Sequence, residues 1–205
     1  MDDALLAVAR DAIGFMPEAE GLALFDAGIE GARHGPLLEV GSYCGKSAVY
    51  LGAAARASGV KLYSIDHHHG SEEHQPGEEY FDARLWDDAA QRVNTWPEFR
   101  RTIARAGLHD VVEGIVGHSA TIAPSWSTPL GLVFVDGGHS APAAHADYEG
   151  WAAHVVPGGL LVIHDVFEDP AEGGRPPFEI YMRALREGFV EGAATGTLRV
   201  LRKPA

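Results

Sequence analysis

Short apolar runs alternate with longer helical segments along the middle of the chain. The apolar runs are bounded by glycine, proline or aspartate and lack period-two alternation, which is typical of parallel strands buried on both faces. They predict strands at residues 36–40, 60–65, 112–116, 132–135 and 160–163. The segments between them predict helices at residues 46–57, 98–106 and 142–154, the last ended by Pro157-Gly-Gly159. This alternation predicts an α/β fold built from right-handed β-α-β units.

The two ends of the chain carry different patterns. Residues 2–33 predict two helices with a break at Met16-Pro17, because a proline deep inside a helix removes a hydrogen bond. Residues 188–191 and 197–201 predict two strands around a turn from Gly192 to Gly196. We therefore expect one domain over residues 1–205, with a helical extension at 1–34 and a Rossmann-like core at 35–203. The core should hold five parallel strands and a C-terminal antiparallel hairpin, with helices on both faces.

The chain is acidic, with 29 Asp and Glu against 16 Lys and Arg and a formal net charge of −13. Such a surface repels phosphate backbones, so nucleic acid is not an expected partner. The longest apolar runs, such as residues 159–163, are far too short to span a bilayer. The lone cysteine, Cys44, and the lack of a secretory signal favour a reducing compartment. We therefore expect a cytoplasmic protein without membrane contact that acts on a small molecule, with a homodimer as one candidate assembly.

A glycine-containing turn follows the first predicted strand and opens the first long helix. Gly41 and Gly45 allow a tight turn and a close approach to a ligand, and the helix N-terminus offers free N–H groups. Asp66 ends the second predicted strand, where a carboxylate can accept hydrogen bonds from both hydroxyls of a ribose. The pattern favours an adenosine-type cofactor. The alternative is ordinary turn chemistry between a strand and a helix.

This turn resembles the first motif of class I S-adenosylmethionine-dependent methyltransferases, an acidic residue followed by spaced glycines. It departs from that motif at Tyr43, where many members carry a glycine. Later segments are similar to the family's adenine-flanking, fourth-strand and fifth-strand motifs: Val116–Ser119, Val133–Ser140 and Pro157–Asp165. The resemblance implies the class I methyltransferase sheet and S-adenosylmethionine as cofactor. The residues implied to bind it are Glu39, Gly41, Ser42, Gly45, Ser47, Asp66, His67, His118, Ser119 and Asp136.

The segments Asp136–His139 and His164-Asp165 are similar to those of family members that methylate hydroxyls of small molecules with a divalent metal. Asp136 and the His164-Asp165 pair end neighbouring predicted strands, so their side chains should converge at one edge of the sheet. Two carboxylates there suit Mg²⁺, and a third ligand from His164 would make Mn²⁺ competitive. The alternatives are that Asp136 caps the following helix, that Asp165 pairs with Arg175 and that His164 only packs in the core.

A hydroxyl that accepts a methyl group must lose its proton. His139 lies three residues after Asp136 on the same turn, and the pKa of histidine lies near neutrality, which suits a general base. We therefore expect His139 and Asp136 to be catalytic, with the metal activating the hydroxyl. The alternative for His139 is a capping or substrate-binding role.

Two loops without periodicity, residues 67–81 and 167–177, follow predicted strands at the edge where open α/β sheets bind ligands. Their carboxylates can accept hydroxyl hydrogen bonds, and Tyr80, Phe81 or Trp86 can stack on a sugar ring. These carboxylates belong to Glu72, Glu73, Glu78, Glu79, Glu168, Asp169 and Glu172. The alternative is a solvated acidic rim. The segments Asp66–Gly70 and Gly173–Pro177 are also similar to those of O-methyltransferases of methylmannose polysaccharides, which implies a 3-O-methylated mannoside methylated at O1.

Three other function classes fit parts of the sequence. One is a catechol-type, phenol-type or other natural-product O-methyltransferase, although the lysine of the catechol type is missing from residues 137–140. Another is an NAD-dependent oxidoreductase, whose Gly-x-Gly-x-x-Gly turn residues 41–45 do not supply. The third is a pure binding module, which would not need acids and a histidine at the strand ends. We therefore expect a metal-assisted O-methyltransferase that acts on a small neutral acceptor, most specifically a sugar.

Overall fold

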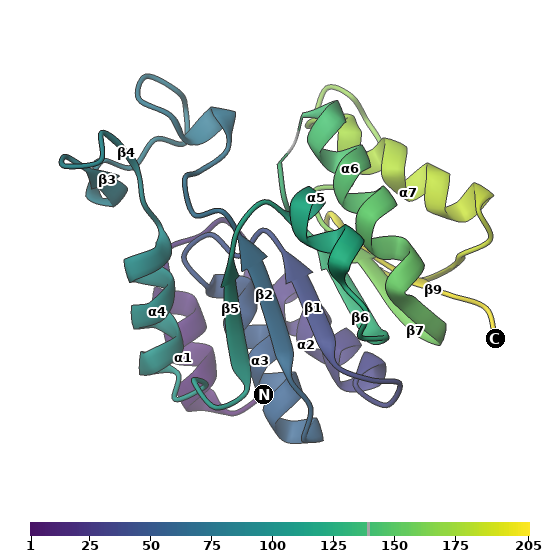
Figure 1. Cartoon of the computed structure of the whole chain (residues 1–205). Helices are drawn as coiled ribbons and strands as arrows, with labels where there is room; N and C mark the ends of the chain where they lie inside the picture. The colour runs from purple at the N-terminus through teal and green to yellow at the C-terminus, as the bar shows by residue number, and fades with distance from the viewer. Residues whose placement is uncertain (139) are drawn as a thin grey trace.

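A seven-stranded sheet forms the centre of the protein (Figure 1). The computed structural model describes residues 1–138 and 140–205. The strand order is β5-β2-β1-β6-β7-β9-β8; the first five of these run parallel, and β9 is antiparallel to both β7 and β8. The strands are β1 (Leu37–Val40), β2 (Leu62–Asp66), β5 (Val112–Val116), β6 (Leu130–Val135), β7 (Val155–Ile163), β8 (Val190–Thr195) and β9 (Leu198–Arg202). The predicted α/β fold, with five parallel strands and a terminal antiparallel hairpin, is confirmed.

Helices cover both faces of this sheet (Figure 1). One face carries α1 (Asp3–Asp11), α2 (Glu18–Gly31), α3 (Lys46–Ser58) and α4 (Trp96–Arg105); the other carries α5 (Ser119–Ile122), α6 (Ala141–Trp151) and α7 (Pro176–Arg186). Successive side chains of β6 enter opposite cores, Leu132 and Phe134 on the first face and Val133 and Val135 on the second. This two-sided burial explains why the strands lack polar–apolar alternation. None of the helices described is long and apolar enough to cross a membrane.

The N-terminal segment forms two helices, as predicted. α1 ends at Asp11 and α2 begins at Glu18, with Pro17 as the residue that precedes its first turn. A proline is tolerated there because the first N–H groups of a helix have no partner inside the helix. The break leaves residues 12–17 free to lie near the edge of the sheet where the parallel strands end.

The Pro157-Gly-Gly159 segment does not separate helix from strand, contrary to prediction. α6 ends at Trp151 and a 3₁₀ turn follows at Ala152–His154, after which β7 runs from Val155 through this segment. The pairing of β6 with β7 shifts register between Leu130 and Leu132. Such an irregularity tolerates a proline, which has no N–H to donate.

Other elements were not expected from the sequence. α7 begins at Pro176-Pro177, at the end of a segment that the sequence analysis predicted as a loop. Proline is favourable in the first turn of a helix. β8 continues through Gly192 to Thr195, because a register shift between Glu191 and Ala194 keeps it paired with β9. A separate antiparallel ribbon joins β3 (Trp86–Asp87) and β4 (Arg92–Val93). Further 3₁₀ turns lie at Glu72–His74, Ala83–Leu85 and Ala123–Ser125.

A close backbone approach joins the turns after β1 and β6. Gly41 has a positive φ of 88°, and a Cβ built on it would overlap the carbonyl group of Asp136. Gly41 N–H donates to the Ile65 carbonyl (2.9 Å), and Asp136 N–H donates to the Val40 carbonyl (2.9 Å). Both strand ends are therefore held by backbone hydrogen bonds, so an added side chain at Gly41 cannot be accommodated by rotation alone.

We expect Gly41→Ala to destabilise the protein more than Gly59→Ala. Gly59 also has a positive φ, of 69°, but a Cβ there would meet nothing within 4 Å. Gly59→Ala should therefore cost only the left-handed backbone strain, about 1 kcal/mol. Gly41→Ala should add about 1–3 kcal/mol for the overlap with the Asp136 backbone. Urea unfolding of both variants measures the two free energies, and equal losses would contradict this explanation.

Candidate active site

A cavity of about 950 Å³ opens at the carboxyl ends of the five parallel strands β1, β2, β5, β6 and β7. Open α/β sheets bind their ligands at this edge. Most residues predicted for the site line this cavity: Gly41, Ser42, Ser47, Asp66, His67, His118, Ser119, Asp136, His164 and Asp165. His139 lies outside the described residues, so its role as a base stays a prediction. The topology thus brings motifs from five separate strand ends into one space.

Asp66 connects the turns that follow β1 and β2. Its Oδ2 accepts hydrogen bonds from the N–H groups of Ser42 (3.0 Å) and Tyr43 (2.8 Å), and its Oδ1 accepts from His68 N–H (2.6 Å). A carboxylate offers about four lone-pair positions, so about one is left for a ligand. Asp66 therefore orders the glycine turn, a role that the sequence prediction did not include. The predicted bonds to two ribose hydroxyls would have to share the remaining position.

Glu39 and Gly45 are the predicted cofactor residues that do not line the cavity. Glu39 is fully buried in β1, where the Ser64 hydroxyl donates to it. Burial raises the pKa of this carboxyl to about 8, although hydrogen bonds from Ser64 and Ser47 oppose the shift. Gly45 caps α3 with a positive φ of 89°. Glu39 and Gly45 thus lie before and after the turn, outside the cavity lining, and their contact with a cofactor stays a prediction.

The consecutive histidines 67–69 contact different parts of the protein. The His67 ring borders the cavity, with its centroid 4.7 Å from that of His118. His68 is buried, and its Nδ1 lies 2.7 Å from the Thr95 hydroxyl oxygen. Burial lowers the pKa of both rings. His67 and His68 therefore lie in different surroundings, one at the cavity and the other in the core.

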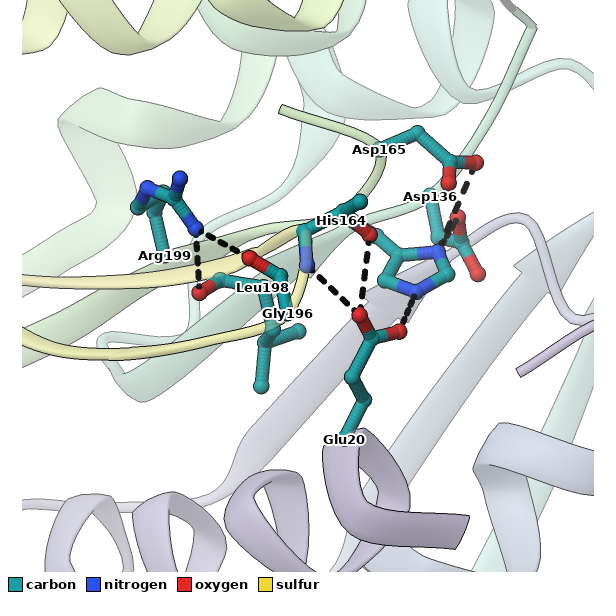
Figure 2. Close-up of polar contacts among 8 residues, drawn as sticks. Glu20, Asp136, His164, Asp165, Gly196, Leu198 and Arg199 are labelled. Atoms are coloured by element: carbon teal, nitrogen blue, oxygen red, sulfur yellow. Dashed lines mark hydrogen bonds and ion pairs between the residues drawn. The ribbon is translucent and has the colours of Figure 1, made fainter. Parts of the chain in front are cut away.

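A buried imidazole lies among three carboxylates at the end of β7 (Figure 2). His164 Nδ1 is 3.0 Å from Asp136 Oδ1 and 3.5 Å from Asp165 Oδ2, while Nε2 is 2.7 Å from Glu20 Oε2. Burial alone would lower the pKa of His164, but Asp136, Asp165 and Glu20 raise it to about 12. The ring is therefore an imidazolium when no other cation is bound. Asp165 is held at a positive φ of 55°, a strained conformation of a kind that clusters at functional sites.

The same cluster has the donor set of a divalent-cation site. Asp136, His164 and Asp165 each offer a ligand atom within 4.8 Å of the others. Carboxylate oxygens and an imidazole nitrogen suit Mn²⁺, and the oxygens alone suit Mg²⁺. The alternative pairing of Asp165 with Arg175 does not hold, because Arg175 donates instead to the carbonyl groups of residues 167 (3.3 Å) and 168 (3.1 Å). Ser140, not Asp136, is the N-cap residue of α6.

Asp147 of α6 is a cavity residue that the sequence analysis missed. Its side chain is 5% exposed, and the Ser119 hydroxyl donates to its Oδ1. Its Oδ2 lies so close to Gly137 that a Cβ there would overlap it. Burial, reinforced by the charge of Asp66, raises the pKa of Asp147 to about 6. A carboxyl with a raised pKa that lines a cavity is typical of a functional site.

The cavity entrance combines acidic and aromatic side chains. Glu72, Glu73 and Glu78 line it from the segment after β2. Phe15, which is 60% exposed, lines it from the break between α1 and α2, with its ring centroid 5.8 Å from that of Tyr43. The aromatic contribution of Phe15 and Tyr43 was not predicted.

Several predicted acceptor contacts are not brought into this cavity. Tyr80 and Phe81 line a second cavity of about 380 Å³, and Trp86 packs edge-on against Phe81 with ring centroids 6.1 Å apart. No described residue of the 167–177 loop lines the main cavity. Glu168 of that loop lies 3.3 Å from the Arg199 guanidinium instead.

Residues 38–166, more than half of the chain, match a family described as a methyltransferase domain. The chain belongs to this methyltransferase family. Membership supports the methyltransferase prediction over an NAD-dependent oxidoreductase. The methyltransferase fold also extends beyond the matched residues, because the terminal hairpin and the N-terminal helices pack on the same sheet.

Solved structures of methyltransferases share this fold. The O-methyltransferase TomG of Streptomyces achromogenes, in complex with SAM, is 18% identical with a TM-score of 0.66, covering 100% of this chain and 91% of its own. An O-methyltransferase from Bacillus cereus in complex with SAH is 17% identical with a TM-score of 0.63, covering 99% and 92%. An SAH-bound methyltransferase from Podospora anserina is 12% identical with a TM-score of 0.67, covering 100% and 89%.

We expect Asp147→Asn to stabilise this methyltransferase at alkaline pH. The folded-state pKa of Asp147, about 6, lies above the usual aspartate value of 3.8. The proton therefore stabilises the fold below about pH 4, and this stabilisation is lost as pH rises through 6. The variant should match the wild type near pH 4 and exceed it by about 3 kcal/mol near pH 8. Urea unfolding across this range measures the difference. Asp110→Asn, at an exposed position, controls for charge removal, and a pH-independent difference for Asp147→Asn would contradict the explanation.

Proposed function

We propose that this protein transfers a methyl group from S-adenosylmethionine to a hydroxyl of a small neutral acceptor, with a divalent cation bound by Asp136, His164 and Asp165. The observation that carries the proposal is a single cavity. It is lined by the turns that contain Gly41 and Asp66 and also by this carboxylate–imidazole cluster. Membership of a methyltransferase family supports the reaction class. The SAM and SAH bound to TomG and to the Bacillus cereus enzyme support the choice of methyl donor.

The charges around the cavity suit a sulfonium donor. Asp66, Asp136 and Asp147 line its inner wall, and a cavity lined by one sign of charge concentrates ligands of the opposite sign. Asp66 is the candidate to accept from a ribose hydroxyl. Lys46 also lines the cavity, and its ammonium is available for the carboxylate of the methionine moiety. The donor would thus lie across the carboxyl ends of β1 and β2 with its sulfonium toward Asp136.

Asp136, His164 and Asp165 would hold the cation, with the Nδ1 lone pair of His164 as the nitrogen ligand. When bound, Mg²⁺ or Mn²⁺ lowers the pKa of an acceptor hydroxyl and fixes its orientation. The Gly41–Asp136 backbone contact supports this arrangement, because a donor bound at the glycine turn would lie next to an acceptor bound at the carboxylate cluster.

His139 is the proposed base for the acceptor hydroxyl. It follows Asp136 by three residues in the sequence, between the end of β6 at Val135 and the start of α6 at Ala141. A neutral imidazole can take the hydroxyl proton as the methyl group is transferred. The reaction then releases S-adenosylhomocysteine, the methyl ether and a proton.

The proposed acceptor is a neutral sugar, most specifically a 3-O-methylated mannoside methylated at O1. Glu72, Glu73 and Glu78 at the entrance can accept several hydroxyl hydrogen bonds, and the exposed Phe15 ring offers a face for the apolar side of a pyranose. The same carboxylates repel phosphorylated or carboxylated acceptors. A second candidate is a phenolic or other natural product, because the Phe15 and Tyr43 rings would also stack on a flat aromatic acceptor.

Methyl transfer should depend on a divalent cation and on Asp165. Excess chelator should abolish release of S-adenosylhomocysteine, and Mg²⁺ or Mn²⁺ should restore it. Asp165→Asn should lower kcat by about 10–100-fold while leaving the Kd for S-adenosylmethionine unchanged, because the change removes a cation ligand and not a nucleoside contact. Asp169→Asn, an exposed acid outside the main cavity, is the matched control. Full turnover in excess chelator would exclude the cation from the proposal.

The acceptor class is tested by offering several compounds together at saturating S-adenosylmethionine. The panel contains 3-O-methylated mannosides, unmodified mannosides, catechols and sugar phosphates. We expect the methylated mannoside to give the highest kcat/KM and the sugar phosphate the lowest. Preference for a catechol would favour the natural-product alternative, and preference for a sugar phosphate would contradict the role given to the entrance carboxylates.

A further inference from the structure

We propose that Glu20 is a positioning residue that turns the Nδ1 lone pair of His164 toward Asp136 and Asp165. The inference rests on the cation site of the proposed function and assigns a new residue to it. Glu20 lies in α2, outside the residues that match the methyltransferase family. The cation site would therefore depend on a part of the chain that the family match does not contain.

Both oxygens of Glu20 are engaged inside the protein (Figure 2). The side chain is 4% exposed. Oε2 lies 2.7 Å from His164 Nε2, and Oε1 accepts from the Thr197 N–H (2.6 Å) and from the Thr197 hydroxyl (3.1 Å). Gly196 closes the pocket, because a Cβ there would overlap Oε1. The carboxylate therefore has little room to rotate or to take another partner.

Without a cation both ring nitrogens of His164 face carboxylates, and the contact with Glu20 fixes which of them keeps its proton when a cation binds. An ionised carboxylate only accepts hydrogen bonds, so Nε2 must be the donor in its contact with Glu20. A neutral ring with its proton on Nε2 has its lone pair on Nδ1. Nδ1 is the atom that faces Asp136 and Asp165, at 3.0 and 3.5 Å. Histidines that bind metals commonly donate their other N–H to a carboxylate, and this donation fixes the ring orientation.

Glutamine at position 20 would break this arrangement with almost no change in size. The amide has one acceptor oxygen and one NH₂ group, whereas both oxygens of Glu20 act as acceptors, one toward His164 and the other toward Thr197. If the amide oxygen takes the place facing Thr197, the NH₂ group faces His164 and favours the tautomer with its proton on Nδ1. If the amide is reversed, two donors face each other at Thr197. Either way the ring loses the contact that directs its lone pair to the cation site.

The first test compares Mn²⁺ binding to wild-type protein, Glu20→Gln and Glu30→Gln by electron paramagnetic resonance titration. Glu30 lies on the same helix and pairs at the surface with Arg202, so its variant controls for charge removal from α2. We expect Glu20→Gln to raise the Kd for Mn²⁺ by about 10–100-fold and Glu30→Gln to leave it unchanged. If the wild type binds Mn²⁺ and Glu20→Gln binds it with the same Kd, the role of Glu20 is overturned and the cation site stands. A wild type that binds no Mn²⁺ would overturn the cation site, and the role of Glu20 with it.

A second measurement needs no variant. Long-range ¹H–¹⁵N correlation spectra of the full-length wild-type protein with Mg²⁺ report which ring nitrogen of His164 is protonated. We expect a proton on Nε2 and an unprotonated Nδ1. The opposite tautomer in the loaded protein would overturn the proposal, even if Glu20→Gln does not fold.

Discussion

The backbone contact between Gly41 and Asp136 sets the layout of the whole cavity. β1 and β6 are adjacent in the sheet, and the turns that leave them lie against each other because Gly41 has no side chain. One turn carries the N–H groups that Asp66 orders, and the other carries the first carboxylate of the His164 cluster. This contact puts the glycine turn and the candidate cation site side by side in one cavity. The proposed donor site and the proposed cation site are therefore adjacent because position 41 has no side chain.

The acidic groups at this edge of the sheet are each stabilised in a different way. Asp66 accepts backbone N–H groups, and Asp136 contacts the His164 imidazolium. Glu39 is buried with a pKa of about 8 and so keeps its proton at neutral pH, whereas Asp147 titrates at about 6. The ionised carboxylates among them, Asp66 and Asp136 at neutral pH and Asp147 above about pH 6, concentrate negative charge, which costs stability and at the same time favours cationic ligands. Repulsion between like charges in a cavity is expected where the cavity binds a ligand of the opposite charge.

The sequence predicted the sheet because its strands are continuous apolar runs separated by glycine, proline and aspartate, and it located residues that lie next to such runs. It did not predict Glu20 or Asp147, because their contacts are with partners distant in sequence. Glu20 and His164 are 144 positions apart, and Ser119 and Asp147 are 28 positions apart. One signal was available for both acids: each lies on the apolar stripe of its helix, where a charge needs a buried partner. Phe15 gave no such signal, since its place at the entrance depends on how the break between α1 and α2 folds over the sheet.

The contact between Glu20 and Thr197 joins residues 177 positions apart, and this separation has a consequence for biosynthesis. A ribosome makes the chain from its N-terminus, and folding can begin before synthesis ends. When His164 leaves the ribosome, α2 can already hold Glu20 beside the sheet, but the β8–β9 hairpin that fixes Oε1 has not yet emerged. The nascent protein can therefore complete its parallel strands while the imidazole is still incompletely anchored. The Thr197 contacts that anchor Glu20, and through it the His164 imidazole, therefore form after the five parallel strands have left the ribosome.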